Sequence, residues 1–205
     1  MTQATARSRP GAYGDGLIIP PETVMAAISE AKHREARAKA RAVATAGDWL
    51  SLVLLHHEQI EAAFADVKLA ATESARQQAQ KHLAILLTGH SNAEESVLYP
   101  ALSRAGEQGG ATTAYSEQAV AKQEMGKLEV LAPSSAAYLE KLEHIREAVA
   151  RHMWEEESDW FLTLKEKGPA AEQATLARRY QEEFDRYVGS EVASPSGRPA
   201  MAEAL

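Results

Sequence analysis

The stretch His90-Ser-Asn-Ala-Glu94-Glu-Ser-Val-Leu-Tyr-Pro100 is the clearest indication of how this 205-residue chain folds. It places an imidazole and a carboxylate four residues apart, so both side chains lie on one face of a helix. Leu83 and Leu86 precede His90 by seven and four positions, which makes that face the apolar one. A polar pair on a buried face needs a partner, and a metal cation satisfies several groups at once.

The same arrangement recurs elsewhere in the chain. His152 and Glu156 form a second His-x-x-x-Glu pair on another apolar helix face. His57 falls on a further apolar stripe, with Glu61 one turn later, but His56 has nearly the same spacing and either histidine could face the core. One such pair alone is usually a solvated ion pair. Its recurrence on three helices favours a metal site built between facing helices of a bundle.

Composition narrows the chemistry of such a site. The chain has no Cys, which excludes thiolate ligands, disulfides and thiol catalysis. His and carboxylate ligands suit iron, manganese or zinc. The net charge of −7 argues against nucleic acid and anionic membranes as partners. The polar first residues do not resemble a signal peptide, so the default location is the cytoplasm.

The rest of the chain predicts helices and almost no strand, because Ala, Glu, Gln, Lys, Arg and Leu dominate. The expected fold is all-α: an antiparallel four-helix bundle with an extra N-terminal helix and a C-terminal helix. The expected divisions are a disordered N-terminal arm (1–20), an accessory helix (21–46), the bundle (48–167), a C-terminal helix (170–188) and a disordered tail (189–205). The two outer helices could cover the bundle or form a homodimer contact, and the sequence does not choose.

Three local features refine this division. Pro100 is expected to kink the second bundle helix near its end. Gly106, Gly109 and Gly110 predict the loop that follows it. No internal sequence repeat is evident.

These residues resemble the hemerythrin-like family, also called HHE cation-binding domains. The resemblance covers about residues 48–167 and rests on stretches 54–61, 90–100 and 152–161. It implies a four-helix bundle around a non-haem iron centre, usually with two iron ions per chain. By position, the implied terminal ligands are His57, His90 and His152, and the implied bridging carboxylates are Glu94 and Glu156.

The chain departs from the family pattern on the third bundle helix, expected at 113–132, which contains no His. The resemblance puts Gln118 at the ligand position. Glu124 has a nearly equal claim by its spacing from apolar residues, and Glu61 on the first bundle helix is a further candidate.

Fewer imidazoles and more carboxylates favour the ferric state of iron, so the hypothesis is that this protein is not a simple oxygen carrier. The leading expectation is a di-iron protein that binds or senses oxygen, peroxide, nitric oxide or iron itself. One alternative is a peroxide- or oxygen-consuming di-iron oxidoreductase. Another is a metal-free helical interaction protein.

Overall fold

The computed structural model describes residues 29–189. The predicted N-terminal arm (1–20), the first part of the predicted accessory helix (21–28) and residues 190–205 of the predicted tail lie outside this range.

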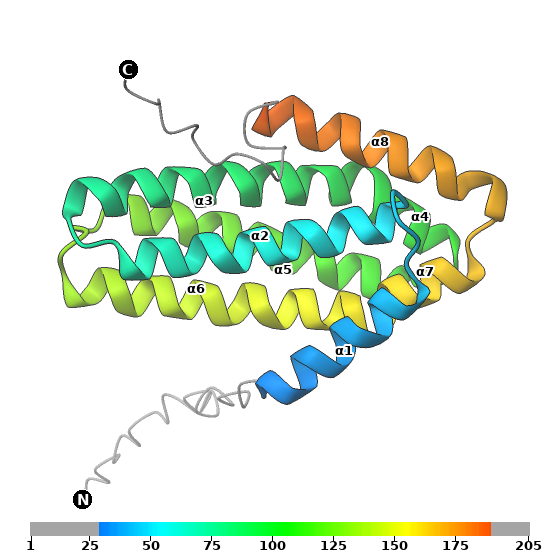
Figure 1. Cartoon of the computed structure of the whole chain (residues 1–205), viewed down its shortest axis with the longest axis horizontal. Coiled ribbons are helices and arrows are strands. Elements are labelled where there is room, and N and C mark those ends of the chain that lie inside the picture. The colour runs from blue at the N-terminus through cyan, green and yellow to red at the C-terminus, as the bar shows by residue number, and fades with distance from the viewer. Residues whose placement is uncertain (1–28, 190–205) are drawn as a thin grey trace, which may run out of the picture.

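Four long helical segments run antiparallel and enclose the core (Figure 1), which confirms the predicted all-α four-helix bundle. Between Ser29 and Gly189 there is no strand. The first segment is α2 (Trp49–Leu69) and the third is α5 (Gln108–Glu129). The second and fourth are composite, and each contains a five-residue π-helix: α3 (Glu73–Ala93), η1 (Glu94–Leu98) and α4 (Tyr99–Arg104); α6 (Ala136–Glu155), η2 (Glu156–Trp160) and α7 (Phe161–Lys167).

Side-chain caps fix where three of these segments begin. The oxygens of Asp48, Thr72 and Ser135 accept hydrogen bonds from backbone N–H groups three residues later, at 2.8, 3.1 and 3.1 Å. Each bond satisfies one of the free N–H groups at a helix start. The caps therefore set the helical register of the segments that carry the candidate ligands.

The helix is irregular just before Pro100, where a kink is expected: η1 is a π-helix that ends at Leu98. In it the Tyr99 N–H bonds to the Glu94 carbonyl, five residues back. Pro100 has no N–H to continue this pattern, and the freed Glu95 carbonyl instead accepts a hydrogen bond from the Tyr115 hydroxyl at 2.6 Å. The chain thus continues into α4 with its exposed carbonyl satisfied.

The predicted loop at Gly106, Gly109 and Gly110 is only partly a loop. Gly106 has the positive φ of a turn residue, at 102°, but Gly109 and Gly110 belong to the first turn of α5. A Cβ on Gly110 would lie 2.9 Å from the Trp160 ring. Gly110 therefore serves close helix packing rather than chain reversal, which a reading of glycine as a breaker misses.

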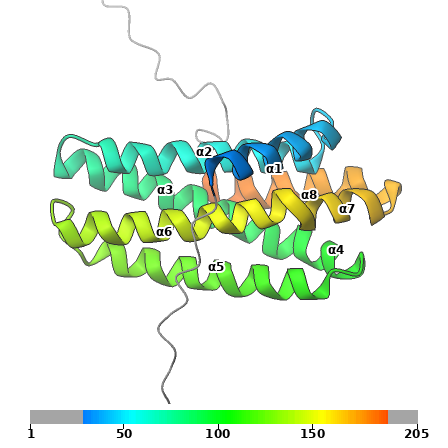
Figure 2. The ribbon, with the colours of Figure 1, turned by 90° about the horizontal axis from the view of Figure 1, so that it is seen from below.

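Two further helices lie against the bundle, as Figures 1 and 2 show. Helix α1 (Glu30–Val43) crosses the outside of η2, α2 and α6. Helix α8 (Ala170–Val188) runs along α3 and α2, and buries Leu176, Tyr180, Phe184 and Val188 against them. Both helices therefore reach the bundle segments that carry the His-x-x-x-Glu pairs.

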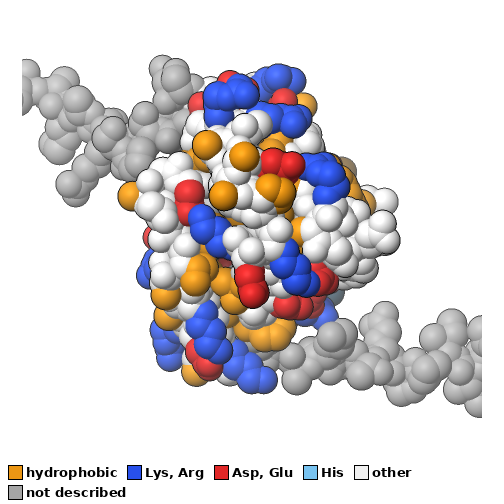
Figure 3. Space-filling model, turned by 90° about the vertical axis from the view of Figure 1, so that its right-hand side faces the viewer, with side chains coloured by type: hydrophobic (Ala, Val, Ile, Leu, Met, Phe, Trp, Pro, Cys, Tyr) orange, Lys and Arg blue, Asp and Glu red, His pale blue; other side chains and the backbone are white. Residues whose placement is uncertain are grey.

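The end of the bundle formed by α4, α7 and α8 has acidic and basic side chains interspersed (Figure 3). Ion pairs at this end include Lys165 with Asp48 and Lys167 with Glu107. No helix within residues 29–189 is long and apolar enough to cross a membrane.

The contact of α3 with α8 can be tested at Gly89, where a Cβ would overlap the Val188 side chain. We expect Gly89→Ala to lower the free energy of unfolding by about 1–3 kcal/mol, because overpacking forces α8 to shift. The matched control is Gly126→Ala in α5, where a Cβ meets nothing within 4 Å. It should raise stability by about 0.5–1 kcal/mol through helix propensity. Urea unfolding measures both, and a Gly89→Ala protein as stable as wild type would contradict this packing.

Candidate metal centre

Four candidate ligands meet inside the bundle, on α2, α3, η1 and η2. One donor atom from each of His57, His90, Glu94 and Glu156 lies within 4.8 Å of the other three. The two carboxylates and His57 have no exposed surface, and His90 is 4% exposed. The structure therefore brings together four of the five principal residues predicted from the sequence, and His152 adjoins them with its Nε2 atom 3.3 Å from Glu156 Oε1.

Each of the three histidines is held from outside through its Nδ1 atom. Glu157 contacts His57 Nδ1 at 2.7 Å, Glu117 contacts His152 Nδ1 at 2.8 Å, and the Tyr180 hydroxyl contacts His90 Nδ1 at 3.0 Å. A partner on Nδ1 fixes the ring orientation and leaves Nε2 to face inward. This is the usual arrangement around metal-binding histidines.

Glu156 spans two histidines on different helices. Its Oε2 atom lies 3.3 Å from His57 Nε2, and its Oε1 atom lies 3.3 Å from His152 Nε2. Glu94 Oε2 lies 3.2 Å from His90 Nε2 and also contacts the Tyr99 hydroxyl at 3.1 Å. The two carboxylates thus lie between the histidines of α2, α3 and α6.

Unpartnered polar atoms test whether these residues fit a cation. Among the described residues, the buried side-chain nitrogen and oxygen atoms without a hydrogen-bond partner are, apart from Gln59 Oε1, all in this centre: His57 Nε2, His90 Nε2, Glu94 Oε1, Gln118 Oε1 and Glu156 Oε2. Leaving a buried polar atom unpaired costs about 1–3 kcal/mol. Atoms that all accept a cation, gathered at one place, fit a metal site.

The pKa values show how the metal-free protein balances its charge. Burial disfavours the charged form of His57, but Glu156 and Glu157 outweigh burial and raise its pKa to about 9. Burial and the charge of Glu156 raise the pKa of Glu94 well above its usual range. Burial also opposes ionisation of Glu156, yet His152 and His57 outweigh it and lower the pKa of that carboxyl. Without a metal, these raised pKa values favour the protonated form of Glu94 and the charged form of His57.

Of the three remaining candidate ligands, one belongs to the centre and two do not. Gln118, 5% exposed, places its amide nitrogen 2.6 Å from Glu94 Oε2, so it belongs to the centre. Glu61 instead binds Arg37 at 2.8 Å, and Glu124 binds Lys127 and Lys141 at 2.5 and 2.6 Å. The structure does not bring Glu61 or Glu124 to the centre, because each is paired with nearby cations.

Both histidines of α2 are buried, but they face different neighbours. His57 faces the centre, whereas His56 stacks on Phe184 with ring centroids 3.6 Å apart and contacts the Tyr180 hydroxyl at 2.9 Å. Helix α8 therefore explains the ambiguity of the sequence, since it provides a second buried surface for α2.

Sequence reasoning missed several residues of the centre, among them Tyr99, Glu157 and Tyr180. The expectation of no internal repeat was wrong at this scale, and a short repeat could have pointed to two of them. His-x-x-x-Glu-Glu-Ser occurs at 90–96 and again at 152–158, and each Glu-Glu-Ser begins a π-helix. π-helices inside α-helices frequently mark functional sites. Tyr99 follows three residues after the first copy, and Glu157 is the second Glu of the other.

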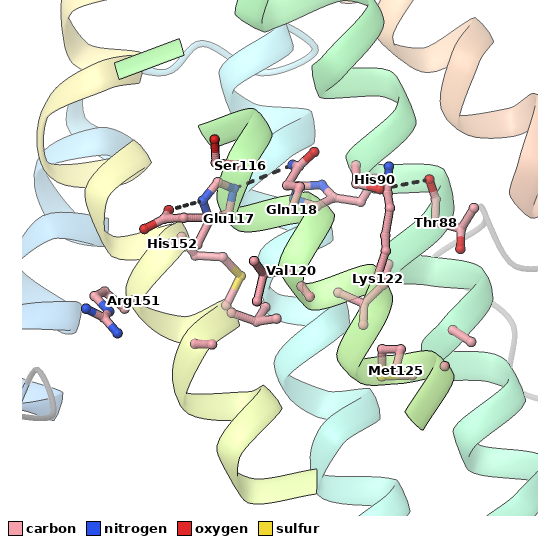
Figure 4. Close-up of a pocket in the computed structure, with 18 of the residues that line it drawn as sticks. Thr88, His90, Ser116, Glu117, Gln118, Val120, Lys122, Met125, Arg151 and His152 are labelled. Atoms are coloured by element: carbon pink, nitrogen blue, oxygen red, sulfur yellow. Dashed lines mark hydrogen bonds and ion pairs between the residues drawn. The ribbon is translucent and has the colours of Figure 1, made fainter. Parts of the chain in front are cut away.

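A cavity of about 520 Å³ leads to the centre between α3, α5 and α6 (Figure 4). Its walls are mostly apolar and include Ala121, Met125 and Val149. His90, Gln118 and His152 also line it, and Figure 4 shows Gln118 and His152 pointing toward one another. The cavity therefore offers a path to the centre on the side of His152.

Comparisons with known proteins agree with this geometry. The described fold resembles a hemerythrin HHE cation-binding domain-containing protein from Mycobacterium kansasii, with a TM-score of 0.61 and 23% identity over 74% of this chain and 94% of that one. A DNA nickase from Nostoc sp. (strain PCC 7120) is 29% identical over 79 residues, which are 38% of this chain and 22% of that protein. The sequence profile of the hemerythrin HHE cation-binding domain matches residues 48–164. The chain therefore belongs to the hemerythrin HHE cation-binding domain family.

Proposed function

We propose that this protein holds two non-haem iron ions in the bundle and uses them to bind or sense oxygen, peroxide, nitric oxide or iron itself. The observation that carries the proposal is the gathering of unpartnered, buried cation-accepting atoms in one centre. His and carboxylate donors without any thiolate suit iron. Residues outside the centre already orient all three histidines toward it.

The proposed roles follow from position. His57 and His90 would hold one ion through their Nε2 atoms, and His152 would hold the other. Glu94 and Glu156 would bridge the two ions. Bound iron would supply an open coordination position for a small ligand and a change of oxidation state. The protein would position the ions and exclude bulk water, and the raised pKa values of Glu94 and His57 would favour their protonated forms when the iron is absent.

The ligand set favours sensing or reaction over reversible oxygen transport. No His on α5 reaches the centre; the α5 side chain there is Gln118. Two carboxylates and few imidazoles stabilise the ferric state of iron. We therefore propose that the centre oxidises readily and does not release oxygen as a carrier must.

Iron content per chain tests the proposal. Protein loaded with ferrous iron without oxygen and then desalted should contain about two irons per chain. His90→Ala should bind less iron because it removes an inward Nε2 atom. The matched control His144→Ala removes an exposed histidine of α6 and should bind as much as wild type. Elemental analysis measures all three, with thermal unfolding before and after loading, since a bound ligand stabilises the folded state.

Two results would contradict the proposal. Wild-type protein that takes up no iron would favour the metal-free helical interaction protein. Equal iron content in wild type and His90→Ala would place the iron elsewhere.

The cavity favours a second candidate function, a peroxide- or oxygen-consuming di-iron oxidoreductase. Its volume of about 520 Å³ is in the range of sites that take organic ligands, about 300–1,000 Å³. A path for a diatomic molecule alone needs far less space. An apolar cavity that reaches His90 and His152 would admit an organic hydroperoxide to the centre.

A substitution that fills the cavity tests whether the protein is a peroxide-consuming enzyme or a sensor. We expect Ala121→Leu to slow consumption of cumene hydroperoxide several-fold more than that of hydrogen peroxide, because the added methyl groups obstruct the larger substrate. Ala62→Leu, on the exposed face of α2, is the matched control and should leave both rates unchanged. Consumption of each peroxide by iron-loaded protein, with ascorbate supplied as the two-electron reductant, measures the effect. A single stoichiometric oxidation, without sustained turnover, would contradict the enzyme and favour the sensor.

Other expectations stay predictions. The match to the DNA nickase spans only 22% of that protein, so we propose no nicking activity and keep the prediction that nucleic acid is not a partner. A cytoplasmic location and a homodimer contact likewise remain predictions from the sequence.

A further inference from the structure

Two aromatic rings in contact lead from the buried centre to the surface of the protein. Tyr99 has no exposed surface, and its oxygen lies 2.9 Å from Glu156 Oε1 and 3.1 Å from Glu94 Oε2. Its ring packs edge-on against that of Tyr115, with ring centroids 5.1 Å apart. Tyr115, in α5, is 40% exposed. The two tyrosines thus join the proposed bridging carboxylates to water.

The other aromatic rings next to the centre end inside the protein. The Trp160 ring lies 6.0 Å from that of His152, measured between centroids, but Trp160 is only 8% exposed. Tyr180, in α8, has no exposed surface. In the described part of the chain, the ring series that connects the centre with solvent is therefore Tyr99 followed by Tyr115.

A water-soluble electron donor has no direct access to the centre. The four gathered ligands are at most 4% exposed, and mostly apolar side chains line the cavity that leads to them. A polar donor would lose its hydration on entering that cavity, which costs free energy. Electrons, unlike molecules, can cross between aromatic rings in van der Waals contact. An exposed tyrosine in such contact therefore gives a donor a place to react.

The surroundings of Tyr115 indicate which donors suit it. Its hydroxyl donates a hydrogen bond to the Glu95 carbonyl at 2.6 Å, and burial and the Glu95 carboxylate raise the pKa of Tyr115. The resting phenol therefore keeps its proton. Loss of an electron makes a phenol a strong acid, so the proton leaves with the electron, and the exposed ring edge lets it reach water. A matching donor gives up an electron and a proton together, as phenols, hydroquinones and enediols do.

We propose that Tyr99 and Tyr115 carry single electrons to the buried centre during its reaction with peroxide, from a phenol, hydroquinone or enediol that reacts at the surface. This inference rests on the proposed iron centre. Reduction of a peroxide breaks the O–O bond and takes up two electrons and two protons. The products are two waters from hydrogen peroxide, or water and an alcohol from an organic hydroperoxide.

Each electron moves in three steps. Tyr99 gives an electron to the centre while its hydroxyl proton shifts along one of its hydrogen bonds, and the proton returns when Tyr115 supplies the next electron. Tyr115 loses its electron to Tyr99 and its proton to water. The donor then gives Tyr115 a hydrogen atom and becomes a radical. Two such passages reduce one peroxide, oxidise two donor molecules by one electron each, and return to water the two protons that the peroxide takes up.

A nitroso spin trap locates the radical that this path produces. The trap bonds covalently to a tyrosyl radical, and peptide mass spectrometry identifies the labelled residue. Iron-loaded protein treated with hydrogen peroxide in the absence of a donor should carry the trap on Tyr115. Tyr187, in α8, is more exposed at 49% but lies outside this ring series, so it should carry several-fold less. Radicals formed in solution would label tyrosines by exposure and would favour Tyr187.

Three variants test the path further. Tyr99→Phe should lose the label on Tyr115, because phenylalanine is much harder to oxidise than tyrosine; iron content is measured alongside. Tyr115→Phe should slow peroxide consumption supported by ascorbate, an enediol, several-fold and bind as much iron as wild type. Tyr187→Phe is the matched control, since it removes the hydroxyl of an exposed tyrosine outside the path. It should match wild type in label on Tyr115, in iron content and in rate.

The outcomes separate this inference from the proposed function. Equal label on Tyr115 and Tyr187, or label on Tyr115 that survives in Tyr99→Phe, would overturn the path and leave the iron centre standing. Iron-loaded protein that does not react with peroxide would likewise overturn this inference alone. Protein that binds no iron would overturn the proposed function and this inference with it. If Tyr99→Phe fails to fold, the comparison of Tyr115 with Tyr187 in wild-type protein decides the question.

Discussion

The burial of Glu94 and Glu156 in one small volume is the constraint on which the rest of this structure depends. Both carboxylates are fully buried, and both contact the Tyr99 hydroxyl. Two ionised carboxylates cannot share a buried site without compensating positive charge. In the metal-free protein, the raised pKa values of Glu94 and His57 favour a proton on each, and these protons contribute to that compensation. In the proposed iron-bound protein, metal ions would replace those protons.

The outer helices α1 and α8 both support this buried centre. Arg37 of α1 binds both oxygens of Glu157 at 3.0 and 3.2 Å, and Glu157 in turn holds His57. Tyr180 of α8 holds His90. Two histidines of the centre are thus oriented through helices that lie outside the four-helix bundle. Such supporting contacts typically change metal affinity by about 10–100-fold when removed.

The helical pattern of the sequence was enough to predict the fold and much of the metal centre. His90, Glu94, His152 and Glu156 were predictable because a four-residue spacing on an apolar face survives any detail of packing. Gln118 followed from the family resemblance. Glu61 and Glu124 satisfied the same spacing, but they pair with Arg37, Lys127 and Lys141, which are cations outside the centre. Helical periodicity does not identify such partners.

Tyr99 was not predictable in this way, since it lies five residues after Glu94. In a regular α-helix, residues three or four apart share a face and residues five apart do not. The π-helix η1 changes that relation by forming a bond from the Tyr99 N–H to the Glu94 carbonyl. His56 and His57 were ambiguous for a different reason. Helix α8 buries the side of α2 that would otherwise face solvent.

The position of bound iron tests the central claim most directly. Crystals of protein loaded anaerobically with ferrous iron, measured at the iron absorption edge, would give an anomalous difference map. We expect two peaks inside the bundle, both next to Glu94 and Glu156. One should lie beside Nε2 of His57 and His90, and the other beside Nε2 of His152. A single peak, or iron bound only at surface carboxylates, would contradict it.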